Sequence, residues 1–308
     1  MSELHVLNLG AGVQSTTLYL LACPGIEKPV PALHFDYAVF ADTQSEPKYV
    51  YRHLEWLKSL GGPEIIVATA GDLKADLVAG RNSAGHQKKP SAKTAALGST
   101  RFASIPAFTA PSHETRPLEY DPIKQAGRVR RQCTPEYKTT VVAKVIRERL
   151  GIKPKCRVPK SVKVFQYLGI STDEGSRSGR VRKRFAESCK WSTPEFPLID
   201  MAWTRAGCSR FLQGKVPHRV RKSACTFCPY HDDATWADMK INDPESWEEA
   251  VSVDRALRTQ GTVCNREMTD ALYLHRQCIP LELVDLSDPK PAKLDQFSLF
   301  DCEGMCGN

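Results

Sequence analysis

The sequence lacks any long hydrophobic run. No stretch approaches about 18 consecutive apolar residues, so no membrane-spanning helix and no membrane partner are expected. The N-terminus reads like a strand and lacks a basic flank before an apolar stretch, so we expect no signal peptide. An internal repeat is also missing. Eleven cysteines without a secretory signal favour a reducing, cytoplasmic compartment, in which thiols serve metal or redox chemistry.

The composition is that of a globular protein with a modest excess of positive charge. The chain has 308 residues, of which 41% are hydrophobic, which suffices for a large domain with a smaller appendage. Its net charge of +8 comes from 43 basic and 35 acidic residues. This excess suits an anionic partner, either a nucleotide or a nucleic acid, but it also fits a role in solubility alone.

One stretch near the start predicts a strand, a tight turn and the beginning of a helix. The apolar run over residues 4–9 is long enough for a buried strand, Gly10 and Gly12 interrupt it, and a new apolar run starts at Leu18. Glycines let the backbone approach a ligand, and a helix N-terminus offers unpaired N–H groups. With the hydroxyls of residues 15–17, this favours a phosphate, although a turn that binds nothing fits equally well. Because no Lys follows the glycines, the stretch is no Walker A loop, and it is no dinucleotide motif either.

The following elements predict an α/β fold. Strands are expected over residues 37–41 and 64–68, with a helix over residues 47–56 between them. This order implies a doubly wound parallel sheet with helices on its faces. Ligands of such sheets bind at the carboxyl ends of the strands. Those ends are residues 10–17, Asp42-Thr43 and Thr69.

Residues 80–130 are rich in Gly, Pro, Ser, Lys and Arg and show no sustained period, so we expect a long mobile loop there. Regular elements return after it. They are a helix over residues 135–150 closed by Gly151, a strand over 163–171, a helix capped by Thr204 and ending at Leu212, and helices over 233–240 and 244–258. We expect one domain over residues 1–215 and a smaller, mainly helical, cysteine-containing module over residues 216–308.

Several of these motifs resemble one family. GAGVQS at residues 10–15 resembles the PP-loop of adenine-nucleotide α-hydrolases. VFADTQSEP at residues 39–47 and QYLGISTDEGSRS at residues 166–178 resemble strand ends of phosphoadenosine phosphosulfate (PAPS) reductases. The segment that begins ACTFCPYHDDATW resembles the cysteine module of PAPS-reductase-like proteins of phages and bacteria. The resemblance covers nearly the whole chain.

The resemblance implies a Rossmann-like core of the HUP type that binds ATP, or PAPS or adenosine phosphosulfate (APS). The residues carried over by position are Gly10, Ala11, Gly12, Gln14, Ser15 and Thr16 around phosphate, Phe40, Ala41 and Asp42 at the adenosine, and Gly169 and Ile170 on its other side. Arg177 or Arg180 would neutralise phosphate. Gln14 replaces the usual PP-loop aspartate, and this uncharged amide weakens the case for Mg²⁺-bound pyrophosphate.

Three cysteines are predicted to bind a metal centre. Cys225 and Cys228 are spaced to point at one ion, and basic neighbours favour their thiolates. The resemblance to DNA phosphorothioation and tRNA thiolation proteins implies that Cys133 joins them on an iron–sulfur cluster of the 4Fe-4S type. Zinc on the same thiolates is the alternative, and unligated thiols are a third possibility. The candidates for a further ligand are His231, Cys302 or Cys306 for the cluster and Cys208 for zinc.

The last residues carry a separate signal. Cys302 and Cys306 flank a glycine-containing segment that resembles the reactive tail of PAPS reductases, so both are candidate catalytic thiols, although such tails are usually disordered. The resemblance implies ATP-dependent sulfur transfer to a nucleic-acid or nucleotide-type acceptor, with a sulfur donor or reductant protein as partner and a homodimer left open. A PAPS or APS reductase that makes sulfite, and a binding protein without turnover, are the alternatives.

Overall fold

A computed structural model describes residues 2–78, 105–129, 132–259 and 270–288. Its main feature is a parallel five-stranded sheet in the order β3-β2-β1-β6-β7, which confirms the predicted α/β class. The inner strand over residues 37–42 begins with a contiguous apolar run because both faces of the sheet are covered there. The strands are β1 (Ser2–Asn8), β2 (Tyr37–Asp42), β3 (Glu64–Thr69), β6 (Val162–Leu168) and β7 (Ser192–Glu195).

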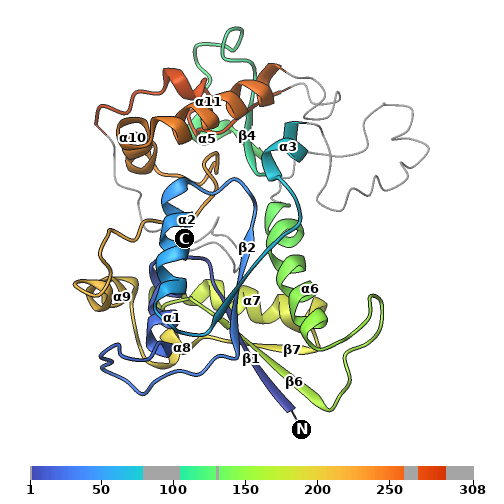
Figure 1. The fold of residues 1–308 in the computed structure, drawn as a ribbon. Helices are drawn as coiled ribbons and strands as arrows, with labels where there is room; N and C mark the ends of the chain where they lie inside the picture. The colour runs from blue at the N-terminus through green and yellow to red at the C-terminus, as the bar shows by residue number, and fades with distance from the viewer. Residues whose placement is uncertain (1, 79–104, 130–131, 260–269, 289–308) are drawn as a thin grey trace.

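Helices cover both faces of this sheet (Figure 1). On one face, α1 (Val13–Ala22), α2 (Lys48–Ser59) and α9 (Arg205–Leu212) bury a core with alternate residues of β1 and β2. On the other face, α6 (Thr140–Arg149) packs its valines against β1, β2 and β6. Two further helices, α7 (Gly175–Ser188) and α8 (Pro197–Asp200), contact β7 and α1 respectively.

The helix predicted over residues 135–150 is present, but it begins with a π-helical turn, Thr134–Thr139, directly after Cys133. The helix ends just before Gly151, as predicted, and this glycine has a φ of +66°. The cap predicted at Thr204 is also confirmed, since its hydroxyl accepts a hydrogen bond from the Gly207 N–H at 3.1 Å.

A second, antiparallel sheet corrects the loop prediction. It contains β4 (Ala107–Ala110), β5 (Gly127–Val129) and β8 (Ala271–Tyr273), and α5 (Pro122–Gln125) precedes β5. The prediction of a loop is therefore wrong for residues 107–110 and 122–129, whereas residues 111–121 form turns without regular structure. These strands are too short to show a period, and their partner β8 lies far along the chain. Residues 80–104 and 130, which also belong to that predicted loop, lie outside the described residues.

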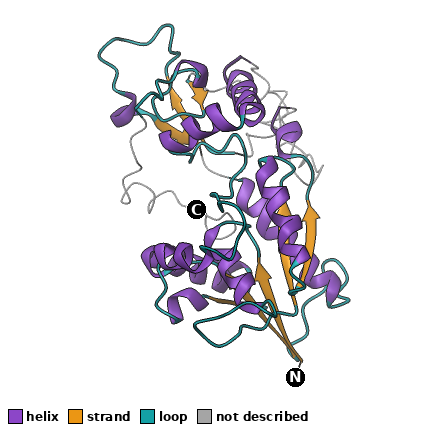
Figure 2. Ribbon diagram, turned by 60° about the vertical axis from the view of Figure 1, so that its left-hand side comes forward, coloured by secondary structure: helices purple, strands orange, loops and turns teal. Residues whose placement is uncertain are grey.

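The small sheet belongs to a second hydrophobic core, at the opposite end of the molecule from the parallel sheet (Figures 1 and 2). It packs with α3 (Leu73–Val78), α10 (Asp233–Asn242), α11 (Pro244–Thr259) and the 3₁₀ turn Leu281–Leu283. The two helices predicted after residue 232 are thus confirmed. This core draws residues from both sides of residue 215, and the domain boundary predicted there stays a prediction. Within the described ranges, no helix has the length and apolarity needed to cross a membrane.

Candidate functional site

The carboxyl edge of the parallel sheet has its topological switch point between β1 and β6. The chain proceeds from β1 to β2 and β3 on one side, and β6 and β7 lie on the other. Crevices at such points are the usual ligand sites of open parallel sheets. The glycine turn follows β1 and residues Gly169-Ile170 follow β6, so the structure brings together the two segments predicted to flank a nucleotide.

The glycine turn leads directly into α1. Ala11 has a φ of +57°, in the left-handed region, and Gly12 is the N-cap residue of the helix. No side chain caps this helix, and its first turn carries no acidic residue. Ser15 and Thr16 are buried in that turn. The N-terminus of α1 therefore keeps its capacity to bind an anion.

Gly169 holds the end of β6 against this turn. A Cβ atom at Gly169 would lie 2.7 Å from the Ser15 nitrogen and 3.0 Å from the Gln14 carbonyl carbon, both backbone atoms. Only glycine allows this approach. Ile170 beside it is buried.

Gln14 is linked to Arg177 through Glu174. The Gln14 amide donates to Glu174 Oε2 at 2.8 Å, and Arg177 donates to Glu174 Oε1 at 2.7 Å. The Gln14 Oε1 atom is buried and accepts no hydrogen bond from the described residues. Arg177 therefore contacts a carboxylate here, and its predicted role toward phosphate stays a prediction, whereas the Gln14 oxygen is a buried acceptor in need of a donor.

The end of β2 supplies backbone and a carboxylate. The Phe40 side chain is buried in the core beneath α1 and α2, and Ala41 is buried on the other face of the sheet, so a ligand would meet the backbone there. Asp42 Oδ1 accepts hydrogen bonds from the Tyr51 hydroxyl at 2.9 Å and the Gln44 N–H at 2.8 Å. Its orientation is thus fixed by the protein.

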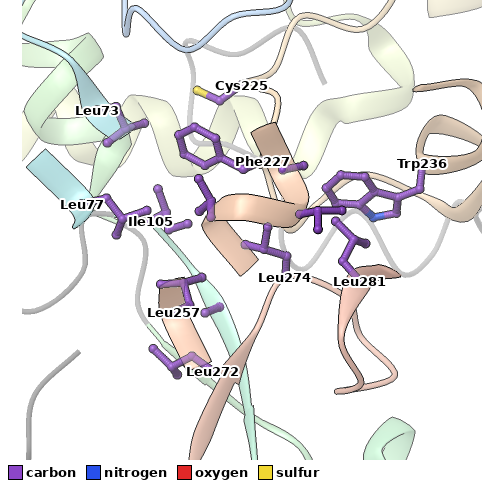
Figure 3. Close-up of a cluster of buried hydrophobic side chains, with 14 of the residues drawn as sticks. Leu73, Leu77, Ile105, Cys225, Phe227, Trp236, Leu257, Leu272, Leu274 and Leu281 are labelled. Atoms are coloured by element: carbon purple, nitrogen blue, oxygen red, sulfur yellow. The ribbon is translucent and has the colours of Figure 1, made fainter. Parts of the chain in front are cut away.

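The cysteine motif lies against the loop that follows β2. Cys225 Sγ is 3.2 Å from Thr43 Oγ1 and 3.9 Å from Glu46 Oε1. The Thr226 N–H donates to the Ser45 carbonyl at 2.9 Å, which joins the two segments through their backbones. Figure 3 shows Cys225 at the edge of the second core, with Phe227 packed inside it. The structure thus brings Cys225 to the same sheet edge as the glycine turn.

A buried ion pair accompanies Cys225. Lys138 Nζ lies 3.2 Å from Glu46 Oε1, and both side chains are buried. Glu46 Oε2 is buried and has no hydrogen-bond partner among the described residues. Sequence reasoning missed this pair. Its one signal is that Lys138 lies on the apolar face of its helix, which Val141 and Val145 continue.

Burial and the neighbouring Glu46 carboxylate raise the pKa of the Cys225 thiol well above its ordinary value, while Lys138 acts in the opposite direction. The charge of Cys133 contributes to the same shift. Cys133 also packs against the second core. A bound cation would offset the cost of the Cys225 thiolate.

His231 has the features of a metal ligand. A hydrogen bond of 2.9 Å joins its Nε2 to the Cys225 carbonyl oxygen, so Nε2 carries the proton. Burial lowers the pKa of His231 to about 4, which keeps the ring neutral. Its Nδ1 is buried and has no partner among the described residues. Metal-bound histidines donate their second ring nitrogen in the same way.

Thiolate and imidazole are the donor types that zinc and iron–sulfur clusters accept. In the parts of the chain that the structure describes, no three His, Cys, Asp or Glu side chains are already arranged around one point. Cys302 and Cys306 lie outside those parts. Cys208 packs in the core under α1, and the structure does not place it in the core that holds Cys225.

A chain of hydrogen bonds that sequence reasoning missed leads away from α1. Thr16 Oγ1 and His53 Nε2 are 2.8 Å apart, and His53 Nδ1 and His218 Nε2 are also 2.8 Å apart. Trp56 stacks on His53. Burial and the charge of His218 lower the pKa of His53 to about 4. The spacing of these residues along the sequence gives no sign of this contact.

Comparisons with known protein families, with curated proteins and with solved structures found no match to this chain. The functional assignment therefore depends on the geometry described above and on the motifs.

Proposed function

We propose that the protein is an enzyme that uses ATP to activate an oxygen of a nucleic-acid or nucleotide-type acceptor and then replaces that oxygen with sulfur. One observation carries the proposal: the CTFC motif lies against the loop after β2, with Cys225 Sγ 3.2 Å from Thr43 Oγ1. Sulfur chemistry and nucleotide chemistry would then share one sheet edge. The resemblance of the glycine turn to PP-loops, and the parallel five-stranded sheet with helices on both faces, support the same assignment.

The reaction has two steps. The acceptor oxygen attacks the α-phosphorus of ATP, forming a P–O bond while pyrophosphate leaves. A sulfide nucleophile from a sulfur donor then attacks the activated carbon, and the C–O bond breaks as AMP leaves with the electron pair. Neither step changes the net oxidation state, so no further reductant is needed.

The residues of this chain have distinct parts in the proposal. The N-terminus of α1 and the Ser15 hydroxyl bind phosphate, and the buried Gln14 oxygen accepts a hydrogen bond from the bound nucleotide. Backbone at Phe40–Asp42 contacts the adenosine. Cys133, Cys225, Cys228 and His231 would hold a cluster or zinc, which supplies a place to bind sulfide when present. Cys302 and Cys306 keep their predicted role as tail thiols.

Two variants test this assignment. A bulky side chain at Gly12, in Gly12→Val, would occupy the space in which phosphate approaches α1. We expect it to abolish ATP binding in calorimetry while metal content stays at the wild-type level. Cys225→Ala should lose iron or zinc after anaerobic purification and keep ATP binding, and Cys156→Ala, at an exposed cysteine, is its control.

Activity is followed as pyrophosphate release in the presence of acceptor and sulfide. Unchanged ATP affinity in Gly12→Val would contradict the nucleotide site, and unchanged metal in Cys225→Ala would contradict the metal site. Sulfite formation from PAPS or APS with a thioredoxin-type reductant would instead identify a reductase.

A further inference from the structure

A cavity of ≈ 690 Å³ lies between α1, α2, α9, α10 and the segment over residues 213–222. This volume falls in the range of about 300–1,000 Å³ typical of small-molecule sites. None of the residues predicted to contact the nucleotide lines it, although Val13, the first residue of α1, does. The cavity is therefore a neighbour of the proposed nucleotide site and is formed by other residues.

The acidic residues of its wall are engaged by the protein. Asp238 is paired with Arg221 at 2.8 Å, Asp232 accepts the Thr235 N–H at 2.7 Å, and Asp243 accepts the Ser246 hydroxyl at 2.8 Å. Each carboxylate thus has a partner.

Two guanidinium groups of the wall have no such partner. Arg205 and Arg219 line the cavity, and neither guanidinium makes an ion pair or hydrogen bond with any residue in the described parts of the chain. By contrast, Arg221 also lies over the Tyr49 ring, 5.1 Å from its centroid, and Lys222 donates to the Tyr230 carbonyl. The cavity therefore has two guanidinium groups available to a ligand, and guanidinium is the side-chain cation that best binds an anion with several oxygens.

The cavity is also joined to the first turn of α1. His218 in its wall contacts His53, and His53 contacts Thr16, each at 2.8 Å. A ligand in the cavity would thus sit close to the helix end at which ATP is proposed to bind. That is the place required of a second substrate that must meet the nucleotide.

We propose that this cavity binds a phosphate group of the acceptor through Arg205 and Arg219. The identification of the ligand as the acceptor rests on the proposed function, whereas the anion site rests on the cavity and its charges. The phosphate belongs either to a nucleic-acid backbone or to a free nucleotide, and both sources present the same chemistry to the two guanidinium groups.

The test compares the double variant Arg205→Gln, Arg219→Gln with Arg210→Gln. Arg210 lies on the same helix, is exposed and does not line the cavity, so it is a matched control. The probes are a labelled single-stranded oligonucleotide of about twelve nucleotides, followed by fluorescence anisotropy, and thymidine monophosphate, followed by calorimetry. Thymidine monophosphate lacks adenine and so reports on the cavity rather than on the ATP site.

We expect the double variant to weaken binding of one probe by about tenfold or more, as for the loss of a charge-assisted hydrogen bond. If the source is nucleic acid, the oligonucleotide is the affected probe and the slope of log K against log salt falls by roughly 1.4, which is two contacts of about 0.7 each. If it is a free nucleotide, thymidine monophosphate is affected and the oligonucleotide does not bind. Arg210→Gln should behave as wild type.

The proposal is overturned if both probes bind the double variant as tightly as they bind Arg210→Gln. It is also overturned if the double variant loses ATP binding in parallel, because the cavity would then be part of the nucleotide site. Gly12→Val distinguishes a failure of this proposal from a failure of the proposed function. This variant should lose ATP binding but still bind the oligonucleotide or thymidine monophosphate.

Discussion

His53 is a histidine buried between helices and kept neutral by its surroundings. Its pKa falls from 6.5 to about 4. Between these pH values the unfolded chain binds a proton at His53 that the folded chain does not. The contribution of His53 to the free energy of unfolding is therefore fully present above about pH 6.5 and is lost as the pH falls toward 4. A shift of this size corresponds to on the order of 3 kcal/mol. His53→Gln should remove most of this part of the acid sensitivity.

The measurement is urea unfolding at pH 7.5 and pH 4.5. Wild type should lose more free energy of unfolding between these values than His53→Gln, by roughly 2–3 kcal/mol. His34→Gln is the control for replacing a histidine by glutamine, because the His34 side chain is 80% exposed. Identical pH profiles for wild type and His53→Gln would show that His53 is not held neutral.

Among the secondary-structure elements, the contact between β6 and α1 shapes the proposed nucleotide site. Gly169→Ala would place a Cβ within 2.7 Å of the Ser15 nitrogen, so the end of β6 must move away from the turn. We expect a loss of about 1–3 kcal/mol in the free energy of unfolding, as for overpacking elsewhere, and weaker ATP binding. Denaturant unfolding measures the change in stability, and calorimetry measures the change in ATP affinity.

Gly179→Ala is the matched control for this variant. Gly179 lies on the exposed side of α7, and an added Cβ meets nothing within 4 Å there. Replacing a helical glycine by alanine should stabilise the protein by roughly 0.5–1 kcal/mol. A Gly169→Ala protein as stable as wild type would mean that β6 and the glycine turn are not in contact.

The elements that the sequence predicts well are those with strong local patterns. Residues 37–42 form β2 because the run is buried on both sides, and Thr204 begins α9 because its hydroxyl caps the helix. The strands β4 and β5 were missed for the opposite reason. Four and three residues long, they are held by pairing with each other and, through β4, with β8 rather than by local preference.

The same distinction holds for the candidate site: its local motifs could be predicted from the sequence, and the contacts between them could not. The glycine turn and the CTFC motif are local patterns, and both lie at the sheet edge. The contacts that join them are not local, since Thr43 and Glu46 meet Cys225 only through the fold. The Lys138–Glu46 pair could not be predicted from the sequence either, because a charged residue on an apolar helix face is normally expected to reach solvent.

Among the described residues, the two largest hydrophobic cores are the one under α1 and α2 on the parallel sheet and the second core around the small sheet. Segments from both halves of the chain build the second. Leu73, Ile105 and Tyr137 pack there with residues beyond 224, and β4 pairs with β8 from Phe108 to Ala110. The two cores meet at the loop after β2, where Cys225 contacts Thr43. Residues 1–215 alone would therefore contain one complete core and part of another.

A fragment of residues 1–215 tests whether that part can stand alone. Without β8, α10 and α11, the apolar side chains of Leu73, Leu77 and Ile105 lose their cover. We expect the fragment to bind a hydrophobic dye, to associate at micromolar concentration and to be cleaved within residues 105–129, whereas a fragment of residues 1–288, which keeps every described residue, should resist. Dye fluorescence, light scattering and limited proteolysis are the measurements. A fragment 1–215 that stays monomeric, binds no dye and unfolds at the temperature of the full chain would establish residue 215 as a true domain boundary, because the second core would then be dispensable to the first.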